Sequence, residues 1–237
     1  VGASQLRLQW LGTPDPKAKV FVELLHRDEE TGEQLSQRFA LKHSAVAGFL
    51  AGTYRIEEKV RRMREEGVDE AACVQLEKQA GDVRQMIESK VLAPTLQVRS
   101  MHTVFQIPFD HRVRVTLDTS IVLLSVNPDQ QGKAGTTWFQ KAKDAVPSDK
   151  LHRYAHSVLT VHTSLGHTDR PPVWLSELSA SGLVTKVPQF SEFQLGCDLL
   201  FRSSVRVRPP FQQQQHSPKL SPPKTLLGGA VGVAATP

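Results

Sequence analysis

The sequence predicts an α+β fold in which antiparallel strands are flanked by helices and followed by a disordered tail. Three observations lead to this prediction. Polar and apolar residues alternate with a period of two over residues 4–42, 95–126 and 154–163, as in strands with one buried face. Apolar residues recur at helical spacing over residues 43–90. Residues 203–237 are rich in proline and glutamine and contain no acidic residue.

The first strands lie within residues 4–42. Gln5–Trp10 alternates polar and apolar side chains, and Val20–Leu24 continues the alternation after a proline-containing turn. A second turn around Gly32 leads into a further run, Arg38–Lys42. We therefore expect two strands and a hairpin in this region.

Residues 43–90 form a predicted helical insertion. Val46, Phe49 and Tyr54 recur at the spacing of one helix face. Residues 57–66 place charges of opposite sign three or four positions apart. This pattern favours a solvent-exposed helix face over a basic ligand patch.

The strand pattern returns in residues 95–126 and again in residues 154–163. Residues 127–150, between them, are polar and contain glycine and proline, so we expect an exposed excursion. Two short helices are predicted to follow, over residues 171–180 and 190–201.

The charge of the chain is concentrated in its tail. The 237 residues carry a formal charge of +5, but residues 203–237 include Arg206, Arg208, Lys219 and Lys224 with no Asp or Glu. The remainder is close to neutral, which argues against a surface that coats nucleic acid. The tail cannot bury enough apolar surface to offset the entropy of ordering. We therefore expect one folded domain over residues 1–202 and a disordered basic tail over residues 203–237.

Several protein classes are excluded by the sequence. Cys73 and Cys197 are isolated, so neither a disulfide framework nor a zinc ribbon is available. This cysteine usage favours a reducing compartment, so we expect a cytoplasmic domain. No apolar run reaches the roughly 20 residues that cross a bilayer, so no membrane span is predicted in this sequence. The chain begins at Val1, close to a strand-like run, and we expect that upstream strands are missing.

The polar faces of the predicted strands carry the candidate binding residues. Arg7, Arg112 and Arg114 alternate with apolar side chains on their strands, and Thr160 and His162 do the same on the last strand. Two interpretations remain open. The polar faces are simply solvated, or they line a closed barrel that holds an anion, for which guanidinium groups are well suited.

The amino-acid sequences of seven segments resemble motifs in the central domain of the vacuolar transporter chaperone (VTC) family. This family is the polyphosphate polymerase branch of the triphosphate tunnel enzymes. The segments occur in the same order as in the family: ASQLRLQWLG (3–12), VFVE (20–23), HRDEETGE (26–33), RFALK (38–42), TVFQIPFD with VRVTLDT (103–119), WLSEL (174–178) and VPQFS (187–191). The similarity extends from residue 3 to about residue 201.

This resemblance implies a closed antiparallel barrel, the triphosphate tunnel fold, with a basic lumen and an acidic metal ligand. Such a domain grips the triphosphate of ATP and extends polyphosphate with the help of Mn²⁺ or Mg²⁺. In this chain, the tunnel domain would occupy residues 1–202 and would lack its first strands.

Phosphate-binding residues follow from the resemblance. Arg7 and Arg114 match the tunnel arginines of the family, and Arg112, His102 and His162 could assist them. Positions such as Trp10, Phe105, Leu117, Asp118 and Trp174 match as scaffold outside the tunnel.

The chain departs from the family at most catalytic positions. Thr160 stands at the position of the metal carboxylate, so no metal ligand and no catalytic residue is predicted to be retained. Gln9, Ser36 and Gln189 replace basic residues, and Leu24–Leu25 replaces a segment with arginine and lysine.

Three functions are compatible with these observations. The first is a catalytically impaired tunnel domain, a pseudoenzyme subunit that binds polyphosphate, triphosphate or ATP and assembles with other VTC subunits. The second is an active polyphosphate polymerase, and the third is a purely structural domain. No specific nucleic acid is expected. The resemblance places the protein at the cytosolic face of a vacuolar or acidocalcisome membrane.

Overall fold

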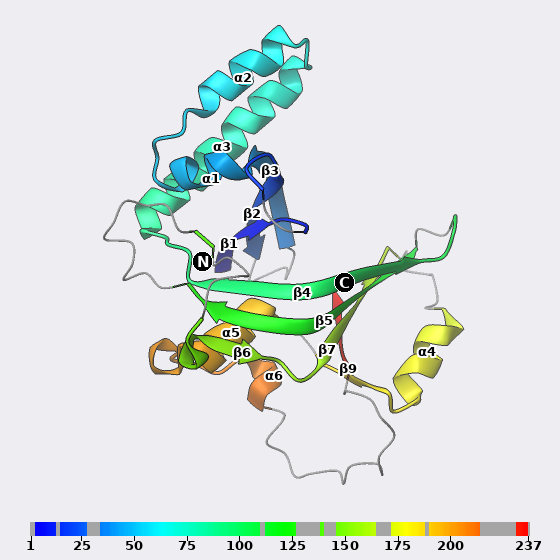
Figure 1. Cartoon of the computed structure of the whole chain (residues 1–237). Coiled ribbons are helices and arrows are strands. Elements are labelled where there is room, and N and C mark those ends of the chain that lie inside the picture. Colours follow the sequence, from blue (N-terminus) through cyan, green and yellow to red (C-terminus); the bar gives the residue numbers. More distant parts are fainter. Residues whose placement is uncertain are drawn as a thin grey trace. The chain divides into compact units, whose positions relative to one another are not determined.

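The computed structural model describes residues 3–12, 15–27, 34–109, 112–126, 138–139, 146–164, 172–187, 190–213 and 231–236. The chain folds as two compact units (Figure 1). Unit 1 comprises Val1–Pro94 and Asn127–Phe139, and unit 2 comprises Thr95–Val126 and Gln140–Pro237.

Unit 1 contains a three-stranded antiparallel sheet and three helices. The strands are β1 (Ala3–Gln9), β2 (Lys19–Arg27) and β3 (Gln34–Lys42), in the order β1-β2-β3. The helices are α1 (His43–Leu50), α2 (Ile56–Glu65) and α3 (Glu70–Lys90). The helices predicted over residues 43–90 are therefore confirmed, and the predicted strands and hairpin form the sheet.

One face of this sheet packs against the helices. Leu8, Val22 and Phe39 are cross-strand neighbours and therefore share that face. Val22 is fully buried, and Phe39 stacks edge-on against Phe49 of α1 with ring centroids 5.6 Å apart. Burial of each such side chain contributes about 1.5–3 kcal/mol. The opposite face of the sheet carries the polar residues.

Trp138 differs from the prediction of an exposed excursion over residues 127–150. It is 6% exposed and lies in the core of unit 1, where its ring meets Trp10 at 5.3 Å and His43 at 5.1 Å. Aromatic packing of this kind can bury a residue whose surrounding sequence shows no strand or helix periodicity. Residues 127–137 and 140–145 lie outside the described part of the chain.

Unit 2 is built on a six-stranded sheet. Its strands are β4 (Leu96–Gln106), β5 (Val113–Ser125), β6 (Leu151–Arg153), β7 (Ser157–Thr163), β8 (Val184–Lys186) and β9 (Val231–Thr236). The order is β4-β5-β7-β9-β8, and β6 pairs with one end of β5. The pairs among β4, β5, β6 and β7 are antiparallel, whereas β9 runs parallel to β7 and β8. The 3-10 helix Ser148–Lys150 precedes β6.

A β-bulge divides one face of this sheet into two parts. The β4–β5 register shifts between Arg99 and Met101, and Ser120 of β5 has a φ of 52°. The extra residue in β5 shifts the alternation of its side chains between the two faces of the sheet by one position. As a result, Ile121 and Leu123 share a face with Asp118 and Arg114, although their numbers have opposite parity.

The two parts of this face are covered differently. Ile121 and Leu123 pack with Leu195 of α5 (Glu192–Leu200) and with Phe211 of α6 (Pro210–Gln213). Helix α5 approaches so closely that a Cβ at Gly196 would lie 2.3 Å from Leu96 of β4. Beyond the bulge, the same face carries polar side chains.

The other face of the sheet is apolar over the same stretch. Val113 and Val161 are buried there against Trp174 and Leu175 of α4 (Val173–Ala180). The helices predicted over residues 171–180 and 190–201 are thus confirmed as α4 and α5. The short strand β8 was not predicted.

Part of the predicted tail is folded. The 3-10 helix Arg202–Ser204 and helix α6 follow α5, and Phe211 of α6 is 2% exposed in the unit 2 core. An aromatic side chain that finds an apolar cluster offsets the entropy of ordering its neighbours, which composition alone does not reveal. Strand β9 also falls in this segment, whereas residues 214–230 lie outside the described part.

The α+β class with antiparallel sheets is confirmed, but the predicted closed barrel is not formed within the described residues. Their strands make two open sheets, because β4 and β8 each pair on one side only in unit 2, as do β1 and β3 in unit 1. None of the described helices is long and apolar enough to cross a membrane.

Candidate phosphate-binding faces

The polar face of the unit 2 sheet brings together three of the predicted phosphate-binding residues. Arg114 of β5 stands directly opposite His162 of β7, and His102 of β4 stands opposite Asp118 of β5. Cross-strand partners share a face, and residues two apart on one strand share it too. Arg114, His102 and His162 therefore lie on one side of the sheet.

The positive charges of this face act on His162. The pKa of the His162 imidazole is lowered by partial burial, by the Arg114 guanidinium and by His102. Burial removes water from the charged imidazolium, and the two neighbouring side chains repel its positive charge. An anion bound beside Arg114 would remove much of this penalty, because it would attract the proton that Arg114 repels.

Asp118 belongs to the same face and was missed as a site residue. Its carboxylate oxygen Oδ1 accepts hydrogen bonds from Ser100 Oγ and from His102 Nδ1, each over 2.8 Å. The sequence analysis placed Asp118 with scaffold positions outside a tunnel. The period-two alternation from Arg114 could have revealed its position, since the two residues are four apart on one strand.

Thr160 lies on this face opposite Thr116, which is buried. Both side chains offer neutral hydroxyls, and Asp118 is already engaged by Ser100 and His102. Among the described residues, no group of three or more His, Cys, Asp or Glu side chains could hold a metal ion. Mn²⁺ and Mg²⁺ prefer carboxylate oxygens, so the donor set of this face does not fit the divalent cation that the resemblance implies.

The polar face of the unit 1 sheet carries Arg7, but with a carboxylate beside it. Arg7 Nε and Nη2 donate to Glu23 Oε2 over 2.9 and 2.5 Å, and Ser36 Oγ donates to Glu23 Oε1 over 2.8 Å. Burial by itself raises the pKa of Glu23, but the hydrogen bonds from Arg7 and Ser36 and the charges of Arg7 and Arg38 outweigh it and hold that pKa below 4.5. Arg7 is therefore neutralised within its own sheet.

Further cations border this face of unit 1. Arg38 lies across from Glu23 on β3, and its guanidinium carbon stacks 3.8 Å from the centroid of the Phe21 ring. Lys59 of α2 donates to the Ala40 carbonyl oxygen. Burial and the charge of Lys19 lower the pKa of Lys59. The face is basic overall, although its central arginine is paired.

Two further positions from the sequence analysis are Arg112 and Gln189, and the structure describes only the first. Arg112 is exposed and lies just before β5 begins, where its carbonyl oxygen accepts a hydrogen bond from the Ser164 amide. Gln189, a predicted substitution of a basic residue, lies outside the described residues. Arg7 belongs to unit 1, whereas Arg112, Arg114, His102 and His162 belong to unit 2.

Comparison with known proteins identifies the family. The model of the VTC domain family matches residues 1–201. The chain is 34% identical over 217 residues to vacuolar transporter chaperone complex subunit 4 of Schizosaccharomyces pombe, a match that covers 88% of this chain and 30% of that protein. It is 29% identical over 217 residues to subunit 2 of the same complex and organism, covering 87% of this chain and 29% of that protein. It is 24% identical over 210 residues to vacuolar transporter chaperone complex subunit 4 of Trypanosoma brucei brucei, a match that covers 84% of this chain and 26% of that protein. The chain thus spans less than a third of the length of these relatives, and it belongs to the VTC domain family.

Proposed function

We propose that the chain is a VTC tunnel domain that binds polyphosphate or triphosphate but is catalytically impaired. The observation that carries this proposal is the polar face of unit 2. There, Arg114 lies opposite His162 and on the same face as His102, while Thr160 stands where the resemblance places the metal carboxylate. This combination supports a domain that can hold a phosphate group but offers no carboxylate at the metal position.

Binding is expected to be weak and dependent on salt. Arg114 offers a planar fork of donors that matches phosphate oxygens, and the His162 imidazole adds positive charge when it is protonated. Asp118 on the same face opposes an incoming anion, because its carboxylate is held there by Ser100 and His102. Exposed charges are screened over about 8–10 Å at physiological salt.

Catalytic impairment follows from the missing electrostatic groups. Thr160 supplies no carboxylate for Mn²⁺ or Mg²⁺, and Gln9 and Ser36 supply no positive charge. Ser36 donates to Glu23, so the place of a basic residue is taken by a group that supports the Arg7–Glu23 pair. Single groups that stabilise a transition state are commonly worth about 10²–10³ in rate, so losing several leaves little activity.

The partners and location of the whole protein are part of the same proposal. The relatives are named as subunits of a vacuolar transporter chaperone complex. We therefore expect this domain to work as an accessory subunit beside other VTC subunits, at the cytosolic face of a vacuolar or acidocalcisome membrane.

Two assays on the purified chain test the proposal. Triphosphate is titrated calorimetrically into the wild type and into an Arg7→Ala, Arg114→Ala double variant, with Arg62→Ala as an exposed control on α2. We expect binding that the double variant loses and the control keeps. Equal affinity in all three proteins would contradict binding at either arginine, and absence of binding in the wild type would favour a purely structural domain.

The second assay measures polyphosphate made from ATP in the presence of Mn²⁺. We expect no synthesis above the level without enzyme. Sustained, metal-dependent synthesis would overturn the impairment and establish an active polymerase. Replacing Thr160 by Glu provides a matched comparison, because it restores the carboxylate that the family places there.

A further inference from the structure

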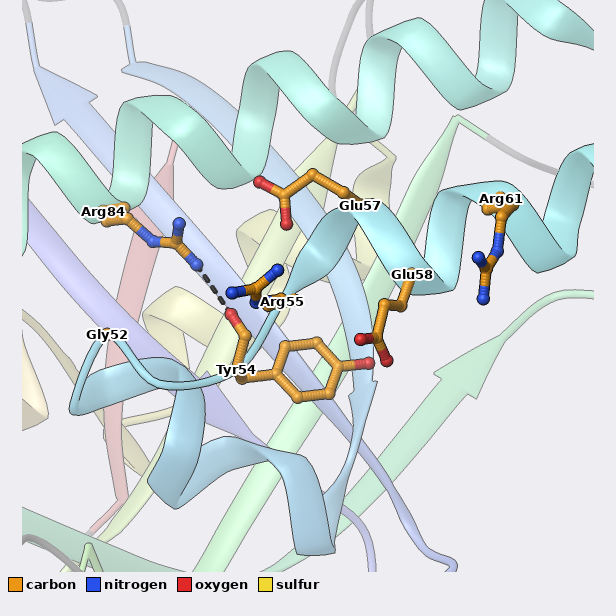
Figure 2. A pocket seen from close by; sticks show the side chains of 7 residues that line it. All are labelled: Gly52, Tyr54, Arg55, Glu57, Glu58, Arg61 and Arg84. Atoms are coloured by element: carbon orange, nitrogen blue, oxygen red, sulfur yellow. Dashed lines mark hydrogen bonds between the residues drawn. The ribbon is translucent and has the colours of Figure 1, made fainter.

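Unit 1 contains a pocket on its helical side, away from the polar sheet face. The pocket has a volume of about 430 Å³ and is lined by Gly52, Tyr54, Arg55, Glu57, Glu58, Arg61 and Arg84 (Figure 2). These residues come from the α1–α2 connection, from the first turns of α2 and from the middle of α3. Its volume lies in the range of small-molecule sites.

Arg84 lies at one end of the pocket, and it has no acidic partner within the described part of the chain. Its Nη2 donates to the Tyr54 carbonyl oxygen over 2.7 Å, and its guanidinium lies 6.0 Å from the Phe49 ring centroid. Its Nε is buried, and none of the described residues accepts a hydrogen bond from it. A guanidinium that is partly desolvated and compensated only by a carbonyl gains much from an anion.

Arg55 adds a second uncompensated charge to the same end. Figure 2 shows the guanidinium groups of Arg55 and Arg84 directed toward the same part of the pocket, beside the Tyr54 carbonyl. Among the described residues, Arg55 has no ion-pair partner. Arg55 is also the N-cap of α2, and no side chain caps that helix, so the backbone N–H groups of its first turn favour an anion as well.

Carboxylates occupy the remainder of the pocket. Glu58 pairs with Arg62 over 3.9 Å, and Arg61 pairs with Glu65 over 3.7 Å, so these two charges are partly satisfied along α2. Glu57 has no ion-pair partner within the described part of the chain. A long polyanion would bring negative charge against Glu57 and Glu58, whereas a compact ligand with one anionic end can turn an uncharged or cationic end toward them.

We propose that this pocket binds a small molecule that carries a single phosphate monoester and an ammonium or hydroxyl group. The phosphate lies between Arg55 and Arg84, and the ammonium or hydroxyl group faces Glu57. The site lies on the helices of unit 1 and uses none of the residues of the sheet faces, so it stands independently of the proposed triphosphate binding.

Calorimetric titration of the full chain with O-phosphoethanolamine tests the proposal. We expect saturable binding, which Arg55→Ala weakens about tenfold, the usual worth of one charge-assisted hydrogen bond. Arg55 is exposed, so this variant leaves the fold intact. Arg84→Lys keeps the positive charge but loses the planar pair of guanidinium donors, and it is also expected to weaken O-phosphoethanolamine binding about tenfold. Lys78→Ala on α3 is the control, because Lys78 is exposed and does not line the pocket, and it is expected to bind as the wild type.

Two comparisons define the ligand class. Glu57→Gln is expected to weaken O-phosphoethanolamine several-fold while strengthening inorganic phosphate, because the carboxylate attracts the ammonium and repels the anion. Triphosphate is expected to be insensitive to Arg55→Ala. The proposal is overturned if O-phosphoethanolamine fails to bind at millimolar concentrations, or if Arg55→Ala and the wild type bind it equally.

Discussion

The two sheets of this molecule each present an arginine on a polar face, yet the arginines have opposite surroundings. In unit 1, Arg7 stands across from Glu23 and is bonded to it through two nitrogen atoms. In unit 2, Arg114 stands across from His162, whose pKa it lowers. The residue one strand away therefore decides whether an arginine faces a carboxylate, with which it forms an ion pair, or an imidazole, whose pKa it lowers.

The comparison also separates burial from charge. Glu23 has a side chain that is 10% exposed, while that of Arg7 is 42% exposed. The carboxylate is thus the more buried partner, and Arg7 and Ser36 solvate it in place of water. Unit 2 reverses this arrangement, because Asp118 is held by Ser100 and His102 and leaves Arg114 available.

The largest effect is expected at Glu23. Glu23→Gln removes the acceptor charge from a half-buried pair and should lower the free energy of unfolding by about 1–2 kcal/mol, after allowance for the exposure of Arg7. Urea denaturation of the purified chain measures this change. Ser36→Ala is the control, and its loss of one neutral donor should cost less. An unchanged midpoint in Glu23→Gln would show that the pair contributes nothing to stability.

The next effect separates the two arginines by their binding. Arg114→Ala should weaken triphosphate binding about tenfold, since it removes a fork of donors that has no acidic partner among the described residues. Arg7→Ala should change the affinity far less, because Glu23 already occupies Arg7. Titration of triphosphate into each single variant measures the two losses separately. Glu23→Gln should strengthen triphosphate binding in the wild type but not in the Arg7→Ala variant, because only the wild type has an Arg7 to release. Equal losses in the two single variants would remove the distinction between the sheets.

The smallest effect is a difference in pH dependence. The folded-state pKa of Glu23 is depressed, so its contribution to stability is present above about pH 4.5 and is lost as pH falls through the lower folded value. The folded-state pKa of His162 is also depressed, so the unfolded chain binds the proton first and stability declines as pH falls below about 6.5.

As pH falls, protonation of His162 should raise the affinity for triphosphate while it lowers the stability of the fold. A bound anion favours the imidazolium, so affinity should rise as pH falls below 6.5, toward the depressed pKa of His162. The sequence analysis did not anticipate that Arg114 lowers this pKa. Titrations at several pH values in the wild type and in His162→Gln measure the effect, and a pH profile unaffected by the variant would exclude His162.

The strands and helices could be predicted because each carries its own periodicity. Alternation identified the faces of β1 and β2, and helical spacing identified α1 and α3. The short strand β8 and the buried Trp138 could not be predicted in this way, since neither has enough residues to show a period. Phe211 was hidden for another reason, because its neighbours have the composition of a linker.

The candidate sites could be predicted only in part. Matched positions identified Arg7 and Arg114, but no pattern within a single strand shows which residue lies opposite on the next strand. The Arg7–Glu23 pair and the Arg114–His162 pair depend on the register of neighbouring strands, which the sequence of one strand does not reveal. The pocket around Arg84 brings together residues that are about thirty positions apart, and its charged run was interpreted as a solvated helix face.

The bulge at Ser120 has a consequence for how such a domain can change over time. On one side of it, Ile121 and Leu123 are sealed beneath α5 and α6 and supply folding free energy. On the other side, Arg114 is exposed on the same face. Replacements of exposed residues there are therefore expected to cost less folding free energy than replacements of Ile121 or Leu123, so this half of the face can vary in sequence while the sheet keeps its shape.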